Sequence, residues 1–158
     1  KCLAQLNNGK LVSGSEDKTI KIWDVKYKKL CSTTEMGSVV YSLLVLSKSG
    51  KLCVGLNKQI KIVNCGDDDK NIIEYTLSAH HSSVNCMINN SLQENSIITG
   101  GGKAIRIWDL NKKSCEYKLE GHNGPIMGLT ILQDKRLVSC SADKTIKIWP
   151  IEDATSKK

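Results

Sequence analysis

The sequence contains no phenylalanine, and its three Trp and four Tyr make up only 4% of 158 residues. A hydrophobic core must therefore be built mainly from Ile, Leu and Val. Only two prolines occur against twelve glycines, so turns depend on Gly, Asn, Asp and Ser. Apolar residues make up 40% of the chain and charged residues 25%, which is the balance of a folded domain and not of a disordered one.

Several functional classes lack their sequence signals. The seven cysteines contain no C-x-x-C pair, so no metal site is expected, and a reduced, intracellular protein is predicted. No signal peptide is present, and the longest apolar run, residues 39–46, is too short to cross a bilayer, so no membrane partner is expected. No G-x-S-x-G elbow or nucleotide motif occurs, and we therefore expect neither a cofactor nor an enzyme.

Two local runs resemble ligand loops without matching them. Residues 100–103, Gly-Gly-Gly-Lys, lack the spacing of a phosphate-binding loop and are predicted to form a tight turn. Residues 67–69, three consecutive Asp, lack the alternating ligands of a calcium loop and are predicted to be a solvated loop tip. Neither run supports a ligand site.

The formal charge of +7 raises the possibility of a nucleic-acid partner. The lysines are spread along the whole chain, however, and no basic stripe is interleaved with aromatic residues. The pattern favours a solvated surface over a nucleic-acid groove.

The clearest feature is an internal repeat. Residues 11–25 read LVSGSEDKTIKIWDV and residues 137–151 read LVSCSADKTIKIWPI. Residues 97–110, IITGGGKAIRIWDL, are a third copy, and residues 52–64, LCVGLNKQIKIVN, are a weaker one. Equivalent positions are separated by 40, 45 and 41 residues, namely Trp23, Val63, Trp108 and Trp149. A period near 40 residues indicates a repeat architecture.

Each copy alternates apolar and polar residues with the period of two that strands require. Ile20 and Ile22 are expected to face one side, with Lys21 and Trp23 on the other. A second strand precedes the Ser-x-Asp-Lys turn. Two further strands complete each repeat: one upstream of that pair, at residues 40–43, 84–87 and 126–129, and one after the Trp position, at residues 30–34, 72–77 and 114–119. Four short antiparallel strands per repeat are therefore predicted.

The Trp-Asp pairs at 23–24 and 108–109, the Gly-His pair at 121–122 and the repeat period resemble WD40 repeats over essentially the whole chain. The resemblance implies an all-β fold of β-propeller blades, each with four antiparallel strands. We expect four blades within residues 1–151, at about 1–34, 35–78, 79–119 and 120–151, followed by a polar tail at 152–158.

The resemblance also implies a structural hydrogen-bonded tetrad of His, Ser or Thr, Asp and Trp. The fourth repeat offers His122, Ser139, Asp143 and Trp149, and a hydrolase interpretation of its Ser-His-Asp set is rejected because no oxyanion hole or pocket is predicted. The second repeat has Met36, Val54 and Val63 at these positions. The other repeats offer partial sets, which are His80, Thr99 and Trp108 in the third and Ser13, Asp17 and Trp23 in the first.

The chain begins in the middle of a repeat and ends just after the third strand of the last one. We therefore expect the C-terminal portion of a longer, seven-bladed propeller. The alternatives are an open arc that pairs with a second copy and a closed four-bladed ring. In the first two cases, further blades or a second copy would cover the open blade faces.

The function implied by the resemblance is a scaffold that binds a partner peptide or domain on the loop-bearing face. The alternatives are an RNA- or ribonucleoprotein-associated propeller and a non-catalytic appendage of an upstream kinase or ubiquitin-ligase module. The partner-binding candidates lie at the start of the first strand and before the turn Asp, namely Tyr41, Asn85, Met127, Glu16 and Ala142.

Overall fold

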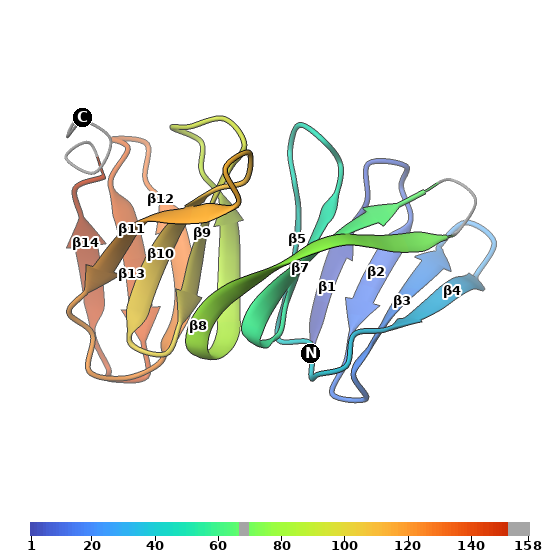
Figure 1. The fold of residues 1–158 in the computed structure, drawn as a ribbon, viewed down its shortest axis with the longest axis horizontal. Helices are drawn as coiled ribbons and strands as arrows, with labels where there is room; N and C mark the ends of the chain where they lie inside the picture. The colour runs from blue at the N-terminus through green and yellow to red at the C-terminus, as the bar shows by residue number, and fades with distance from the viewer. Residues whose placement is uncertain (67–69, 152–158) are drawn as a thin grey trace. The chain divides into compact units, whose positions relative to one another are not determined.

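A computed structural model describes residues 1–66 and 70–151, and every regular element in these residues is a β-strand (Figure 1). The predicted loop tip at 67–69 and the predicted polar tail at 152–158 lie outside the described residues. The strands are β1 (Cys2–Gln5), β2 (Leu11–Gly14), β3 (Thr19–Asp24), β4 (Lys29–Glu35), β5 (Ser42–Val45), β6 (Leu52–Gly55), β7 (Asn57–Cys65), β8 (Asn71–Asn89), β9 (Ser96–Gly101), β10 (Ala104–Asp109), β11 (Ser114–Glu120), β12 (Ile126–Ile131), β13 (Leu137–Ser141) and β14 (Ile146–Trp149).

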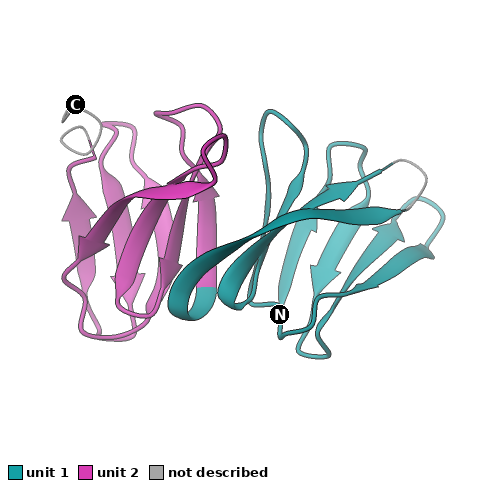
Figure 2. Cartoon of the chain, in the orientation of Figure 1, with its two compact units in different colours: residues 1–84 teal, residues 85–158 magenta. Residues whose placement is uncertain are grey.

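The chain divides into two compact units, residues 1–84 and 85–158 (Figure 2). Unit 1 holds blade 1, with strand order β1-β2-β3-β4, and blade 2, formed by β5, β6, β7 and the first part of β8. Unit 2 holds blade 3, formed by the last part of β8 with β9, β10 and β11, and blade 4, with order β12-β13-β14. The sheets are antiparallel and open, which confirms the predicted propeller-type blades.

The alternation in the sequence explains which side chains enter the core. In β3 the side chains of Ile20 and Ile22 are buried, whereas Lys21 and Trp23 between and after them are half-buried. The third strand of each four-stranded blade shifts register directly before the Trp position, between Ile22 and Trp23 and between Ile107 and Trp108. The same shift occurs between Ile62 and Val63. A bulge at this position re-aims the following side chain.

Each unit has its own hydrophobic cluster. In unit 1, Val12, Ile20, Ile22, Leu52 and Val54 are buried together. In unit 2, the cluster contains Ile98, Ile105, Ile107, Ile126 and Leu137. These aliphatic cores are what a chain without phenylalanine must build.

Two glycines allow neighbouring blades within a unit to approach closely. A Cβ atom at Gly14, the last residue of β2, would overlap the side chain of Val40 at the start of blade 2. A Cβ atom at Gly100 in β9 would lie 2.7 Å from the side chain of Ile126, the first residue of β12. Any side chain at either position would therefore force the two blades apart.

The antiparallel order places particular segments at the same end of each sheet. The turn between the second and third strands and the start of the first strand share one end, which we call the central-hairpin end. The central-hairpin turns are residues 15–18, 56–59, 102–103 and 141–145. The Gly100–Lys103 run forms a tight turn between β9 and β10, as predicted, with Gly102 at φ +57°.

The structure differs from the predicted strands in two places. The first strand of blade 2 runs from Ser42 to Val45, not from 40 to 43, because the backbone N–H of Val40 donates to Ser15 in blade 1. The strands predicted at 72–77 and 84–87 form the single 19-residue strand β8, and the break predicted between them was wrong. Ser83 pairs with Asn57 and the Val84 N–H donates to Leu56, so the backbone stays extended.

Candidate functional site

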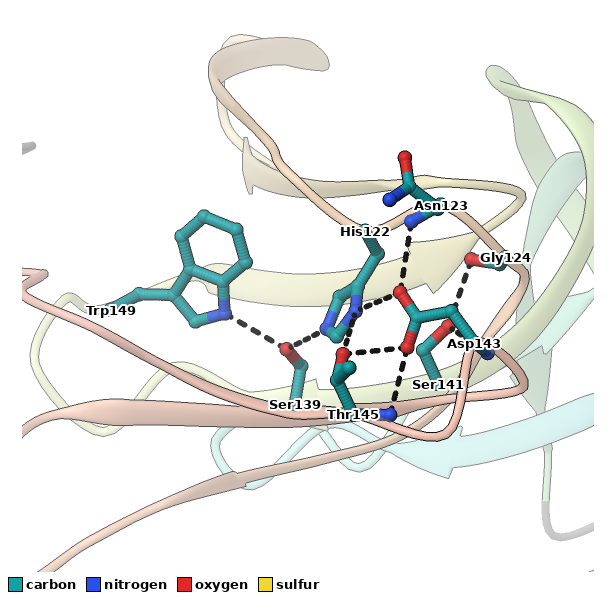
Figure 3. Close-up of polar contacts among 8 residues, drawn as sticks. All are labelled: His122, Asn123, Gly124, Ser139, Ser141, Asp143, Thr145 and Trp149. Carbon is teal, nitrogen blue, oxygen red and sulfur yellow. Dashed lines mark hydrogen bonds and ion pairs between the residues drawn. The ribbon is translucent and has the colours of Figure 1, made fainter.

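Blade 4 contains a continuous polar network that joins three of its segments (Figure 3). His122 precedes β12, Ser139 lies in β13, and Trp149 ends β14. The Nδ1 of His122 is 2.8 Å from Oδ2 of Asp143, and its Nε2 is 2.8 Å from Oγ of Ser139. The indole Nε1 of Trp149 donates to the same Ser139 Oγ at 2.8 Å. The structure thus brings the four residues together.

The donors and acceptors at the two ends of this network fix its direction. An indole N–H can only donate and a carboxylate can only accept. Ser139 Oγ therefore accepts from Trp149, and the Nδ1–H of His122 donates to Asp143, while Nε2 of His122 is hydrogen-bonded to the same Ser139 Oγ.

The turn of blade 4 adds bonds that sequence reasoning missed. The Thr145 hydroxyl donates to Oδ1 of Asp143 at 2.6 Å and lies 3.1 Å from Nδ1 of His122. The Asn123 N–H donates to Oδ2 of Asp143, and the Ser141 hydroxyl donates to the Gly124 carbonyl. The available signal was the repeated S-x-D-K-T pattern at 15–19 and 141–145.

These bonds also set the charge state of Asp143. The hydrogen bond from Thr145, followed by those from Asn123 and His122, lowers the pKa of the Asp143 carboxyl far below its ordinary value, against the opposing effect of burial. Each of these donors is directed at the ionised form. Asp143 is therefore a fixed anion that holds the turn to the segment before β12.

The distances within the Ser-His-Asp set are those of a catalytic triad, but its surroundings differ. Ser139 is 1% exposed and the His122 side chain is fully buried. The Ser139 oxygen already accepts the Trp149 N–H, and the Trp149 ring packs edge-on against His122 at 6.1 Å between centroids. A substrate carbonyl has no approach to this oxygen, so the arrangement serves polar satisfaction and not acyl transfer.

Blades 1 and 3 contain parts of the same network. In blade 1 the Trp23 indole donates to Ser13 at 2.9 Å, and Asp17 accepts from the Thr19 hydroxyl at 2.7 Å. In blade 3 the Trp108 indole donates to Thr99 at 3.0 Å. His80 is buried in β8 within unit 1, and its place in the blade 3 network stays a prediction.

Blade 2 fills the equivalent positions with apolar side chains. Met36, Val54 and Val63 are at most 1% exposed and belong to one hydrophobic cluster. The sheet geometry is therefore compatible with either solution.

The predicted partner-binding residues fall into one group in each unit. In unit 1, the Lys1 ammonium lies 5.5 Å above the Tyr41 ring and 2.7 Å from the Glu16 carboxylate. In unit 2, the Asn85 side-chain amide donates to the Ile126 carbonyl at 2.9 Å and lies 3.9 Å from the sulfur of Met127. The Ala142 N–H donates to the Pro125 carbonyl. All five residues lie at a central-hairpin end, and their role in binding stays a prediction.

Other kinds of site have no support within residues 1–66 and 70–151. No group of three His, Cys, Asp or Glu side chains there is arranged to hold a metal ion. The same residues contain no helix long and apolar enough to span a membrane.

Comparison with known proteins identifies the repeat. The WD40 family model, described as "WD domain, G-beta repeat", matches residues 1–24, 71–109 and 113–150, together more than half of the chain. The unmatched residues 25–70 contain most of the apolar blade 2. Cell division control protein 4 of Saccharomyces cerevisiae is 28% identical over 96% of this chain and 22% of its own length.

Two further similarities agree with this match. The ribosome biogenesis protein WDR12 homolog of Drosophila virilis is 23% identical over 92% of this chain and 35% of its own length. The crystal structure of the computationally designed Ika8 protein superposes with a TM-score of 0.75 at 25% identity, over 94% of this chain and 44% of that one. The chain spans less than half of each of these three proteins.

Proposed function

The chain belongs to the WD40-repeat family, whose members are generally non-catalytic protein-interaction scaffolds, and from that premise we propose that it binds a partner protein at the central-hairpin ends of its blades. Fold alone does not assign a function, so the proposal has to rest on particular side chains. The proposal assigns no catalytic activity to the repeats themselves.

The observation that carries the proposal is the exposed, braced Met127. Its side chain is 56% exposed although it follows a fully buried residue, Ile126. Asn85 from the neighbouring blade holds the Ile126 carbonyl, so the backbone beneath Met127 is fixed. Met is a flexible and polarisable side chain that adapts to partner surfaces. In unit 1, Tyr41 occupies the matching position, next to Lys1 and Glu16.

A photo-crosslinking amino acid at position 127 tests this proposal. The control is the same substitution at Leu132, which is also an exposed apolar residue but lies just beyond the opposite end of β12. We expect crosslinks to a discrete partner from position 127 and few from position 132. Equal crosslinking from both positions, or crosslinking from 132 alone, would contradict binding at the central-hairpin end.

An RNA-associated role is the second candidate, supported by the +7 charge and by the similarity to a protein named for ribosome biogenesis. Binding to an RNA oligomer should then weaken steeply as salt concentration rises, because bound cations are released from the phosphates. No binding at low salt would eliminate this candidate. Both relatives, named for cell division control and ribosome biogenesis, support an intracellular location.

A role as the non-catalytic part of a longer protein is compatible with both candidates. The chain covers only 22% of the yeast protein and 35% of the fly protein. In that arrangement, additional blades or a second copy would cover the open sheet faces. Other domains of the longer protein would then act on the partner that the repeats bind.

A further inference from the structure

The central hairpins share a charge pattern that the structural network does not use. Each hairpin carries two basic residues three positions apart. This holds for the three blades that contain the Trp of the repeat and also for blade 2, which has Val63 there. The hairpin segments 15–21, 56–61, 102–106 and 141–147 contain eight basic residues and only three acidic ones. The pairs are Lys18 and Lys21, Lys58 and Lys61, Lys103 and Arg106, and Lys144 and Lys147.

The first lysine of each pair stands on the turn itself. Lys18, Lys58, Lys103 and Lys144 are all exposed, and within the described residues none of the four forms an ion pair. Three of them hold a left-handed backbone, with φ of 69° at Lys18, 65° at Lys58 and 68° at Lys144. Glycine adopts this conformation at lower cost, so turn geometry alone does not call for lysine there.

The nearby carboxylates are engaged elsewhere. Asp143 accepts bonds from Thr145, His122 and Asn123, and Glu16 is bound by Lys1. The second basic residue of each pair is half-buried, and one of them, Lys61, donates its ammonium to the Met36 carbonyl at 2.8 Å. The turn lysines are thus exposed positive charges that are not paired with a carboxylate in residues 1–66 and 70–151.

We propose that the central-hairpin end of each unit, taken by itself, can hold an acidic segment of a partner protein. Lys18 and Lys58 would bind it in unit 1, and Lys103 and Lys144 would bind one in unit 2. The inference rests on the proposed scaffold function and specifies the chemistry of its partner. Lysine is a point charge that meets flexible carboxylates without demanding one geometry. The exposed Met127 beside these turns suits the apolar residues of a peptide.

A protein segment fits these ends better than a nucleic acid does. Binding of single-stranded nucleic acid relies on aromatic platforms for base stacking. Tyr41 is the only aromatic residue among the proposed contact positions, and its ring is already covered by the Lys1 ammonium.

The test compares two double variants of the whole chain that lose the same charge. K18Q/K144Q removes one turn lysine from the central-hairpin end of each unit. K28Q/K135Q removes one lysine per unit from turns at the opposite end, where Lys28 and Lys135 also have a left-handed backbone, with φ of 51° and 68°. Binding of a short fluorescein-labelled polyglutamate peptide is followed by fluorescence anisotropy, with an oligouridylate as the second probe. Circular dichroism verifies that both variants are folded.

We expect K18Q/K144Q to weaken polyglutamate binding about fivefold, because each lost exposed ion pair contributes a fraction of a kcal/mol. K28Q/K135Q should weaken it by less than about twofold, through the net charge alone. Equal losses in the two variants, no binding of polyglutamate by the wild type, or stronger binding of oligouridylate would each overturn the inference. If crosslinking from position 127 persists in K18Q/K144Q, the scaffold function survives while the acidic partner does not.

Discussion

Blades 2 and 4 solve the same packing problem with opposite chemistry. In blade 4, Trp149, Ser139 and His122 are linked by hydrogen bonds that end on the carboxylate of Asp143. In blade 2, Val63 and Val54 lie at the equivalent positions, are fully buried and form no such network. The first three strands of both blades keep the same order, β5-β6-β7 in blade 2 and β12-β13-β14 in blade 4. The network is therefore not needed to form a blade, and its value lies in fixing the turn and the preceding loop.

The largest effect is expected from truncation at the Trp position. Trp149→Ala should lower the free energy of unfolding by about 3 kcal/mol, because it leaves a cavity and removes the donor to Ser139. Val63→Ala, at the equivalent position of blade 2, should cost about 2 kcal/mol through the cavity alone. Denaturant unfolding gives the magnitudes, and hydrogen exchange assigns them to residues 85–151 or 1–66.

Trp149→Phe serves as the control for the cavity, because it keeps most of the ring volume but has no N–H. It should cost about 1 kcal/mol, which is the contribution of the hydrogen bond. Identical changes for Trp149→Ala and Val63→Ala would contradict a network role for Trp149.

Exchanging the chemistry of the two blades should cost somewhat less. Val54→Thr keeps the side-chain volume but buries a hydroxyl among apolar groups, at a cost of about 2 kcal/mol. Ser139→Val makes the reverse change and leaves Nε2 of His122 and the indole N–H of Trp149 without their partner, at a similar cost. Thermal unfolding of the two variants measures both costs. A neutral result for Val54→Thr would mean that blade 2 can also accept the polar solution.

The sequence predicts much of this comparison but not its details. The repeated Trp and Val positions predict which blade is polar, and the period-two pattern predicts the burial of Ile20 and Ile22. Thr145 was missed because its role depends on a turn that brings its hydroxyl to both Asp143 and His122. The continuous β8 was missed because residues 78–83 contain three serines, which are typical of turns, while their extension depends on pairing with blade 2.

Acid should remove part of the stability that the polar network gives to blade 4 and that blade 2 does not have. The folded-state pKa of Asp143 lies below its ordinary value of 3.8, so the stability it contributes is fully present above that value and is lost as the pH falls towards the folded pKa. Asp143→Asn should therefore destabilise the protein at about pH 6 and make little difference well below pH 3.8.

Unfolding measured at several pH values, with hydrogen exchange to locate it, checks this dependence. The strands β6 and β7 of blade 2 provide the internal control, because their turn has Asn57 and no carboxylate at the equivalent place. A pH-independent cost of Asp143→Asn would show that shape, and not the ionised carboxylate, holds the turn.

The smallest expected effect is a gain, and it should be the same in both blades. Lys144 and Lys58 both hold a left-handed backbone, so Lys144→Gly and Lys58→Gly should each raise the free energy of unfolding by about 0.5 kcal/mol, since relief of strain is partly offset by the greater freedom of unfolded glycine. Lys147→Gly, within strand β14, should instead destabilise. Differential scanning calorimetry measures all three. A gain in blade 2 alone would mean that the blade 4 network already fixes its turn. Equal gains, together with weaker polyglutamate binding, would show that these turns retain lysine for binding at the expense of stability.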